Sequence, residues 1–386
     1  FGDDLRAGHC RVRPGVELAD KTTSGGVWSV AGLAREAAYV VSQQGGRPAL
    51  GGTPSDDSVS HLITELKARG LKVTLYPFLM MDIAADNARP DPWSGAASQP
   101  AYPWRGRITC DPAPGRLGSP QGTATAAAQV ASFFGGGDWN YRRMVLHYAR
   151  LAGDAGGVDA FLIGSELKAL TRLRAGAGLY PAVVALAALA ADVKAIVGDA
   201  TKVTYGADWT EYGCDVIEAG EVRFPLDPLW ASPHIDMIGI DYYAPLADWR
   251  DEAGHPDSQL AASTYDLAYL AGNISAGEAF DWHYPDHAAR ATQIRAPITD
   301  GLGKPWMFRL KDVWNWWSQP HHARVGGVEL ATPTAWLPKS KPIWITEVGC
   351  PAVDKGANQP SVFPDPKSSE NAAPYFSNGA RDDLMQ

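Results

Sequence analysis

The sequence predicts an α/β fold of the (β/α)8 TIM-barrel class with long loop insertions. Helical segments alternate with short, almost continuously apolar segments, and no GxGxxG motif follows the first of these. Apolar strands that alternate with helices are typical of parallel sheets covered on both faces. The absence of a glycine-rich phosphate loop favours a closed barrel over a doubly wound sheet.

Three helices are predicted from capping residues and apolar periodicity. "SDDSVSHLITELKARG" (55–70) has a Ser/Asp cap, apolar residues spaced for one helix face, and a stop at Gly70. "YRRMVLHYARLAGDAGG" (141–157) and "PAVVALAALAADVKAIVGD" (181–199) have the same character. Each is followed by an apolar run, which completes the βα repeat.

Six strands are predicted, whereas a closed barrel has eight. The first ends near "ALGGTP" (49–54), and the others end at Asp82, Glu166, Asp208, Tyr242 and Glu347. We therefore expect residues 1–386 to be a single domain excised from a larger protein, with strand 1 before residue 1 and strand 8 after residue 386. "NGARDDLMQ" (378–386) is then expected to open a helix. The alternative is that two weak strands lie within the chain.

Two segments are too long for simple connections. Residues 83–122 are rich in Pro, Gly, Asp and Arg, and residues 244–340 hold "AGEAFDWHY" and "KDVWNWWSQPHH". Loops of this size at the carboxyl ends of barrel strands usually build the functional site. We predict both as insertions at the active-site face.

Charge and cysteine content exclude several classes of partner. The formal net charge is −9 and no basic block occurs, which argues against nucleic acid and anionic membranes. No run of 18 apolar residues occurs, so membrane insertion is not predicted. The four cysteines (Cys10, Cys110, Cys214 and Cys350) are far apart, so they signal neither a zinc site nor a disulfide framework, although one disulfide between two of them stays open.

Tryptophan is unusually frequent. Fourteen Trp accompany 14 Tyr, and several lie in loop-like segments. Many must anchor the core or the loops, but some suit a cleft that stacks flat, partly apolar rings such as sugars.

Two predicted strands end in glutamate, Glu166 in "AFLIGSE" and Glu347 in "PIWITE". Strand ends of this polarity converge on one face of a barrel, where the active site lies. Cleavage of a glycosidic bond needs two such carboxylates, one to protonate the leaving oxygen and one to attack carbon or activate water. We predict Glu347 as the nucleophile and Glu166 as the acid/base, its pKa raised by the nearby negative charge. The bland alternative for each is a buried ion pair.

Other residues are weaker candidates. Glu278 and Asp281 are alternative carboxylates. Asp82 lies at a strand end, where it could line the site, cap a helix or form a salt bridge at the rim. Lys311 with Arg309 could neutralise an acidic sugar or pair with the excess acids. The adjacent His321 and His322 lack a partner carboxylate at helical spacing, so no metal site is predicted. The candidate substrate-binding residues are Ser165, Asp208, Trp209, Asp241, Tyr243, Trp314, Trp316 and Arg309.

The chain resembles known families in two ways. Acid/base and nucleophile at the ends of strands 4 and 7 resemble the (β/α)8 retaining glycoside hydrolases. The chain is more similar still to the TIM-barrel-like domain of the large tail-tip (baseplate) protein of gene transfer agents and related phages. That resemblance covers nearly the whole chain and rests on "GGTPSD", "LYPFLMMD", "YPWRGRITCDP", "AGGVDAFLIGSELKALT", "YGADWTEY", "LDPLWASPHIDMIGIDYY", "DWRD", "KPIWITEVGCPAVDKGANQPSVFPDPKSSE" and "RDDLMQ".

The resemblance implies a glycoside hydrolase-like module of a virion-like particle's tail tip, acting on a bacterial cell-surface or peptidoglycan glycan. It implies other tail or baseplate proteins as partners, and no cofactor. One departure matters: such enzymes usually carry Asn before the acid/base, and this chain has Ser165. The alternatives are a structural or receptor-binding module with a vestigial cleft, and a free-standing cytoplasmic glycosidase, which fits the family-like blocks less well.

Overall fold

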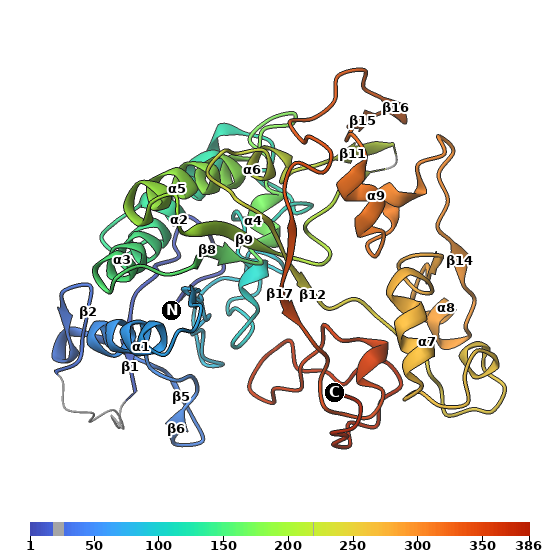
Figure 1. The fold of residues 1–386 in the computed structure, drawn as a ribbon, viewed down its shortest axis with the longest axis horizontal. Helices are drawn as coiled ribbons and strands as arrows, with labels where there is room; N and C mark the ends of the chain where they lie inside the picture. Colours follow the sequence, from blue (N-terminus) through green and yellow to red (C-terminus); the bar gives the residue numbers. More distant parts are fainter. Residues whose placement is uncertain (18–26, 219) are drawn as a thin grey trace.

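A parallel sheet of five strands forms the centre of the computed structural model, which describes residues 1–17, 27–218 and 220–386. The strands lie in the order β17-β12-β9-β8-β7 (Figure 1). Their bounds are Ile343–Val348 (β17), Ile238–Tyr242 (β12), Lys202–Asp208 (β9), Ala160–Ser165 (β8) and Thr74–Leu75 (β7). Five of the six predicted strands are therefore found, and their order matches one wall of a (β/α)8 barrel.

The described residues form a barrel-like half sheet rather than a closed ring of eight strands. The strand predicted near residues 49–54 is wrong, because that stretch has no strand pairing. Two glycines and a proline in "ALGGTP" explain this, since Gly and Pro weaken strand pairing. Beyond β7, Gly2 instead makes a parallel bridge to Met81.

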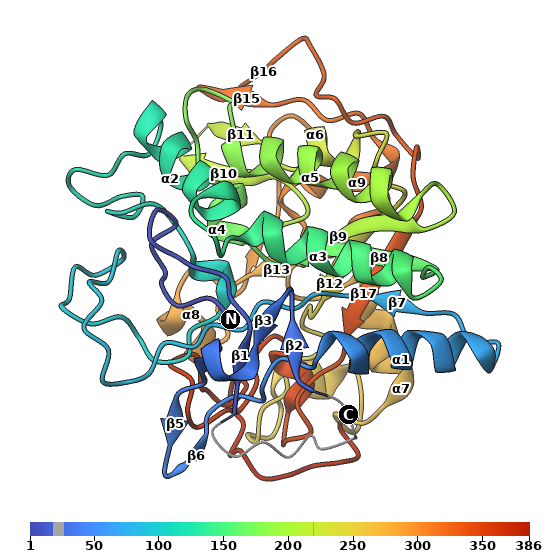
Figure 2. The ribbon, with the colours of Figure 1, turned by 90° about the vertical axis from the view of Figure 1, so that its left-hand side faces the viewer.

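Helices cover the outer face of the sheet. α3 (Tyr141–Asp154) packs between α1 (Asp56–Ala68) and α5 (Pro181–Val197), as Figures 1 and 2 show. These three helices were predicted, and each begins and ends near its expected residues. The other helices are α2 (Ala124–Gly135), α4 (Lys168–Thr171), α6 (Asp227–Trp230), α7 (Leu267–Gly272), α8 (His287–Ala291) and α9 (Val313–Ser318).

Short strands decorate the loops around this frame. One four-stranded sheet pairs β10, β11, β15 and β16, and the remaining strands form two-stranded pairs. Their bounds are Gly15–Val16 (β1), Ser29–Val30 (β2), Leu33–Ala34 (β3), Tyr39–Val40 (β4), Gln43–Gln44 (β5), Arg47–Pro48 (β6), Asp215–Glu218 (β10), Glu221–Arg223 (β11), Trp282–His283 (β13), Ala296–Pro297 (β14), Arg324–Val325 (β15) and Val328–Glu329 (β16).

The hydrophobic core lies between the sheet and these helices. Every residue of β8 is buried, and so is every residue of β9 after the first. In contrast, β17 has no fully buried residue and exposes Trp344, Ile345 and Val348. The sheet is thus packed at its β7–β9 side and open at β17.

The two long segments differ in structure. Residues 83–122 form a loop whose one short helical turn, Arg105–Arg107, lies against α4. Residues 244–340 contain α7 to α9 and form a lobe at the right of Figure 1. The expected opening of a helix at 378–386 is wrong, because these residues form turns and a single bridge, Val353 to Arg381. No helix in the described ranges has the length and apolar character to cross a membrane.

Candidate active site

The end of β8 presents Glu166 through an unusual backbone conformation. Gly164 has φ +142° and Glu166 has φ +52°, a left-handed value that non-glycine residues rarely adopt. A Cβ at Gly164 would lie 1.7 Å from the Tyr141 hydroxyl, so only glycine fits there. The Glu166 amide donates to the Gly206 carbonyl at 2.8 Å, which holds the turn. Strain of this kind persists where the surroundings fix it, and it clusters at functional sites.

Glu166 is held by two donors from the 83–122 insertion. Its Oε2 accepts from Trp104 Nε1 at 2.7 Å and forms an ion pair with Arg105 Nη2 at 2.9 Å. Burial is the largest influence on the Glu166 carboxyl and raises its pKa, although Arg105 and Trp104 oppose that shift. Burial therefore makes Glu166 easier to protonate than an exposed glutamate, and the neighbouring Arg105 stabilises its ionised form.

Ser165 faces away from the cavity described below. Its hydroxyl contacts Tyr76 and Arg105, and its carbonyl accepts from Arg105 Nε at 3.0 Å. The serine that replaces the expected asparagine is buried and fixes Arg105. Ser165 does not line the cavity, so its side chain does not reach the 2-hydroxyl of a sugar bound there.

Glu347 lies on β17, opposite Glu166. Its Oε2 accepts from the Tyr243 hydroxyl at 2.9 Å. In the register of the sheet its direct neighbour is Asp241 on β12, at a point where the pairing shifts by one residue. The Glu347 carboxylate is thus held by Tyr243, which follows β12, and lies beside Asp241, which belongs to β12.

Asp241 lies beneath both glutamates and is fully buried. Its Oδ1 accepts from Thr346 Oγ1 at 2.6 Å, whereas Oδ2 has no partner among the described residues. Burial, followed by repulsion from Glu347 and Glu166, raises the pKa of Asp241 to about 8, against the opposing effect of the Thr346 hydrogen bond. The predicted substrate-binding role is not supported by this position, because Asp241 does not line the cavity.

The three acids form one cluster. One carboxylate oxygen from each of Glu166, Asp241 and Glu347 lies within 4.8 Å of the other two. It is the one group within the described residues whose spacing would also suit a metal ion. His321 takes no part in it, because this ring is buried and contacts the Asp227 carboxylate at 2.9 Å.

A cavity of about 630 Å³ opens above the cluster, and Glu166 and Glu347 lie in its wall. Aromatic rings from five stretches of the chain contribute to it, including those of Trp104, Trp209 and Tyr243. Asp208 also lines it, with Oδ1 accepting from the Thr210 amide at 2.9 Å. Of the predicted substrate-binding residues, Asp208, Trp209 and Tyr243 therefore line the cavity, whereas Ser165 and Asp241 do not.

Three further candidates lie elsewhere. Trp316 is 2% exposed and stacks on Trp336. Trp314 is exposed beside Trp317, and Arg309 pairs with Asp312 at 3.7 Å. None of these three candidates lines the cavity, because the 244–340 lobe uses them for its own packing.

The alternative carboxylates are engaged in structural contacts. Glu278 is paired with Arg290, and Asp281 accepts from the Gly277 amide at 2.7 Å. Asp82 accepts from Tyr39 and Ser42. Lys311 is buried and donates to the Pro245 carbonyl at 2.7 Å. The four cysteines are free thiols.

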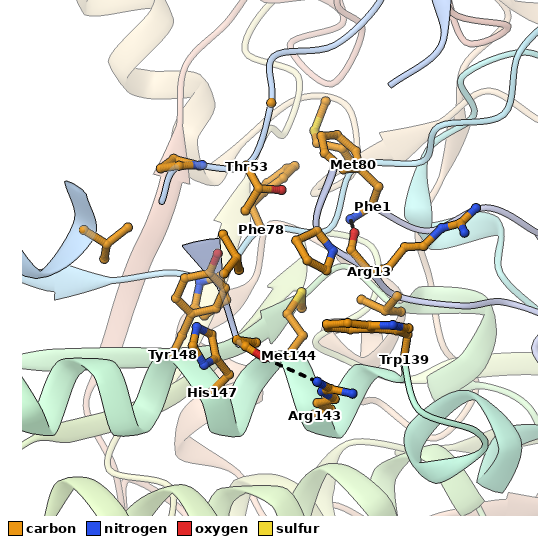
Figure 3. Close-up of a pocket in the computed structure, with 18 of the residues that line it drawn as sticks. Phe1, Arg13, Thr53, Phe78, Met80, Trp139, Arg143, Met144, His147 and Tyr148 are labelled. Carbon is orange, nitrogen blue, oxygen red and sulfur yellow. Dashed lines mark hydrogen bonds between the residues drawn. The ribbon is translucent and has the colours of Figure 1, made fainter. Parts of the chain in front are cut away.

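A second cavity, of about 330 Å³, lies between the N-terminal segment, the β7 region and α3. Figure 3 shows its largely apolar wall, with Phe78, Met80 and Trp139, and with Arg143 donating to the Ala31 carbonyl. None of the described residues that line it carries a carboxylate, and the Nε2 of His147 in its wall contacts Asp56 Oδ1 at 2.7 Å. This cavity therefore lacks the pair of carboxylates that cleavage of a glycosidic bond needs.

The sequence analysis missed Trp104 and Arg105 as site residues. They lie in "YPWRGRITCDP", which was noted only for its resemblance to a family. A cluster of Arg and Trp in an insertion at the active-site face was the available signal, but nothing in the spacing shows which strand end it reaches.

A half-barrel sheet, strand-end carboxylates and an aromatic cavity define a TIM-barrel-like domain. The model of the GTA TIM-barrel-like domain matches residues 139–386, so the chain belongs to this family of gene transfer agent modules. The matched range contains all three acids but neither Trp104 nor Arg105. No curated protein matches the chain. Membership implies a protein associated with the gene transfer agent particle.

Proposed function

We propose that this domain is a retaining glycoside hydrolase that cleaves a glycan of the bacterial envelope. The observation that carries the proposal is the approach of Glu166 and Glu347 to within 4.8 Å in the wall of one cavity. Retaining enzymes hold their two carboxyl groups about 5–5.5 Å apart, and inverting enzymes about 6.5–9.5 Å apart to admit a water molecule. An approach of one oxygen from each glutamate to within 4.8 Å favours the retaining geometry.

Each glutamate has surroundings that suit one role. Tyr243 occupies Oε2 of Glu347, which leaves Oε1 to bond to the anomeric carbon as the glycosidic C–O bond breaks. Glu166, with its raised pKa, gives its proton to the departing oxygen. In the second step Glu166 takes a proton from water, which displaces Glu347 from the sugar, and Arg105 stabilises the ionised Glu166 between the two steps.

The cavity fits a saccharide. Its volume lies within the roughly 300–1,000 Å³ of small-molecule sites. Aromatic rings such as Trp209 can stack on the apolar face of a sugar, and Asp208 can accept from its hydroxyls.

One observation favours a second candidate, a glycan-binding module without turnover. Glu166 accepts from Trp104 and Arg105 on the same oxygen, as an acid in a purely structural ion pair would. The cavity would then still bind a glycan, but Glu166 would stay ionised and would have no proton to give to the leaving oxygen.

Trapping with a mechanism-based fluorosugar panel separates the two. The full chain and Glu347→Gln are incubated with fluorosugars that represent envelope and peptidoglycan units, and intact mass is measured. A covalent adduct on wild type that is absent from Glu347→Gln supports the retaining mechanism. Saturable binding of the same sugars without any adduct supports the binding module and overturns the hydrolase.

The envelope glycan as substrate, other tail or baseplate proteins as partners, and a position at the tail tip of the particle belong to the same proposal. They are supported by the resemblance of the chain to tail-tip proteins, and a module that meets the recipient cell first would be placed to cut its surface. Immunogold labelling of particles tests the position, and label along the head alone would contradict it.

A further inference from the structure

The carboxyl group of Asp241 occupies a closed position inside the sheet. A Cβ built on Gly206 of β9 would lie 3.0 Å from its Oδ1 and 3.1 Å from its Oδ2. Thr346 of β17 donates to Oδ1. The side chain is therefore enclosed by β9 on one side and β17 on the other, with no exposed surface.

Its second oxygen is unsatisfied. Within the described ranges, no donor reaches Oδ2. A buried carboxylate oxygen without a donor is costly, because ionised acids lose their hydration on burial. The oxygen must therefore carry a proton or face a cation.

The surrounding groups decide between these states. Glu166 at the end of β8, Glu347 on β17, and the hydroxyls of Tyr76 and Tyr243 face the cluster. Arg105 contacts Glu166 and Ser165, and no ion pair with Asp241 is formed. Three ionised carboxylates within 4.8 Å would share a single guanidinium, so the arrangement requires protons.

We propose that Asp241 is a neutral carboxylic acid in the folded protein and positions Glu347 by donating a hydrogen bond from Oδ2 to one lone pair of Glu347 Oε1, whose second lone pair stays free for the anomeric carbon. The two residues are neighbours in register, and Glu347 accepts from Tyr243 on its other oxygen. Glu166 is the poorer acceptor, because Trp104 and Arg105 both contact its Oε2 and already offset its charge.

The role of this hydrogen bond rests on the proposed function, because a nucleophile must be ionised and aimed. A neutral donor stabilises the charge on Glu347 without adding a second charge beside it. Asp241 is thus a positioning residue that does not touch the substrate.

Infrared difference spectroscopy tests whether Asp241 is protonated, and it needs no substrate. The carbonyl band of a protonated carboxylic acid is compared between wild type and Asp241→Asn, well below and well above a pKa of about 8. We expect a band that Asp241→Asn removes and that wild type loses at the higher pH. Subtraction cancels Glu211, a second buried acid whose pKa burial raises to about 7.

Asp4→Asn is the matched control. Asp4 is also buried, but hydrogen bonds from Arg6 and Gln99 outweigh burial and lower its pKa. Its substitution should remove only carboxylate bands. A wild-type spectrum in which Asp241 contributes carboxylate bands at both pH values overturns the proposal.

Calorimetric titration with Ca²⁺ and Mn²⁺ tests the alternative that Asp241 faces a bound cation. No binding that depends on Asp241 is expected. Stoichiometric binding lost in Asp241→Asn would mean that the acids hold a metal ion, and this would overturn the proposal.

The labelling rate by a reactive fluorosugar tests positioning. Asp241→Asn keeps a neutral donor and should stay near the wild-type rate, whereas Asp241→Ala should label about 10–100-fold more slowly, the loss expected for one hydrogen bond to a charged group. Equal rates for the two variants overturn positioning. If no variant labels, the proposed hydrolase fails while the infrared result still decides the protonation of Asp241.

Discussion

β8 and β17 each bring a glutamate to the same edge of the sheet, Glu166 directly after β8 and Glu347 one residue before the end of β17, but their surroundings are opposite. β8 is buried along its whole length and flanked by two strands, whereas β17 is an edge strand with half-exposed apolar residues. Glu166 is fixed by a strained backbone, a tryptophan and an arginine. Glu347 is fixed by one tyrosine and by its neighbour Asp241.

The difference shows that one site can combine a rigid and a loosely packed half. The proposed acid/base, Glu166, lies in the rigid half, where burial raises its pKa. The proposed nucleophile lies in the open half, where less of the protein restricts it. Four predictions test this contrast, starting with the largest expected effect.

The first prediction concerns the two glutamates. Glu347→Gln should lower the release of reducing ends from an envelope glycan by on the order of 10⁴-fold or more, since loss of a nucleophile removes the covalent step. Glu166→Gln should cost about 10²–10⁴-fold, the usual contribution of a general acid/base. Glu65→Gln, on α1 and paired with the exposed Arg69 outside the cavity, is the control and should retain the rate. Equal rates for all three variants would refute catalysis by this pair.

The second prediction concerns the rigid half. Arg105→Met should lower the free energy of unfolding by about 3–5 kcal/mol, because it leaves Glu166 buried without its partner. Arg107→Met removes an exposed pair with Glu370 and should cost about 0–1 kcal/mol. Urea denaturation of both variants measures the contrast, and similar losses would show that the Arg105 pair is not a buried one.

The third prediction compares packing along the two strands. Ile163 on β8 is 0% exposed, and Ile163→Ala should cost about 2–5 kcal/mol of unfolding free energy through the cavity it leaves. Ile345 on β17 is 49% exposed, so Ile345→Ala should cost within about 0.5 kcal/mol. Thermal and urea unfolding provide the values. A large loss at Ile345 would mean that β17 is covered in solution.

The fourth prediction concerns pH. The pKa of Asp241 is about 8 in the folded protein against its ordinary value of 3.8, so the folded state holds a proton that the unfolded chain releases between these values. The contribution of Asp241 to the free energy of unfolding is complete below the unfolded pKa of 3.8 and is lost as the pH rises through the folded pKa of about 8. Asp241→Asn should flatten this decline, whose limit is about 1.4 kcal/mol per pH unit for one proton. Parallel wild-type and variant stability curves between pH 4 and 8 would contradict it.

The features predictable from sequence were those written in local patterns. Apolar runs located β8, β9, β12 and β17, and the acid that closes β8 and the acid within β17 were found because a charge in such a run stands out. Capping residues and periodicity located α1, α3 and α5 for the same reason.

Long-range contacts were not predictable. Trp104 and Arg105 lie about 60 positions before Glu166, with α2, α3 and β8 between them, in a loop whose path no periodicity describes. The same limit explains Trp316, whose ring is used within the 244–340 lobe, and Asp241, whose burial depends on β9 and β17 together.

The space around Asp241 exists because position 206 carries no side chain. A methyl group there would press on both oxygens of the carboxyl and on the Cβ of Ser165. The identities of residues 206 and 241 should therefore be coupled in evolution, so that relatives with alanine at the first position carry something smaller than aspartate at the second.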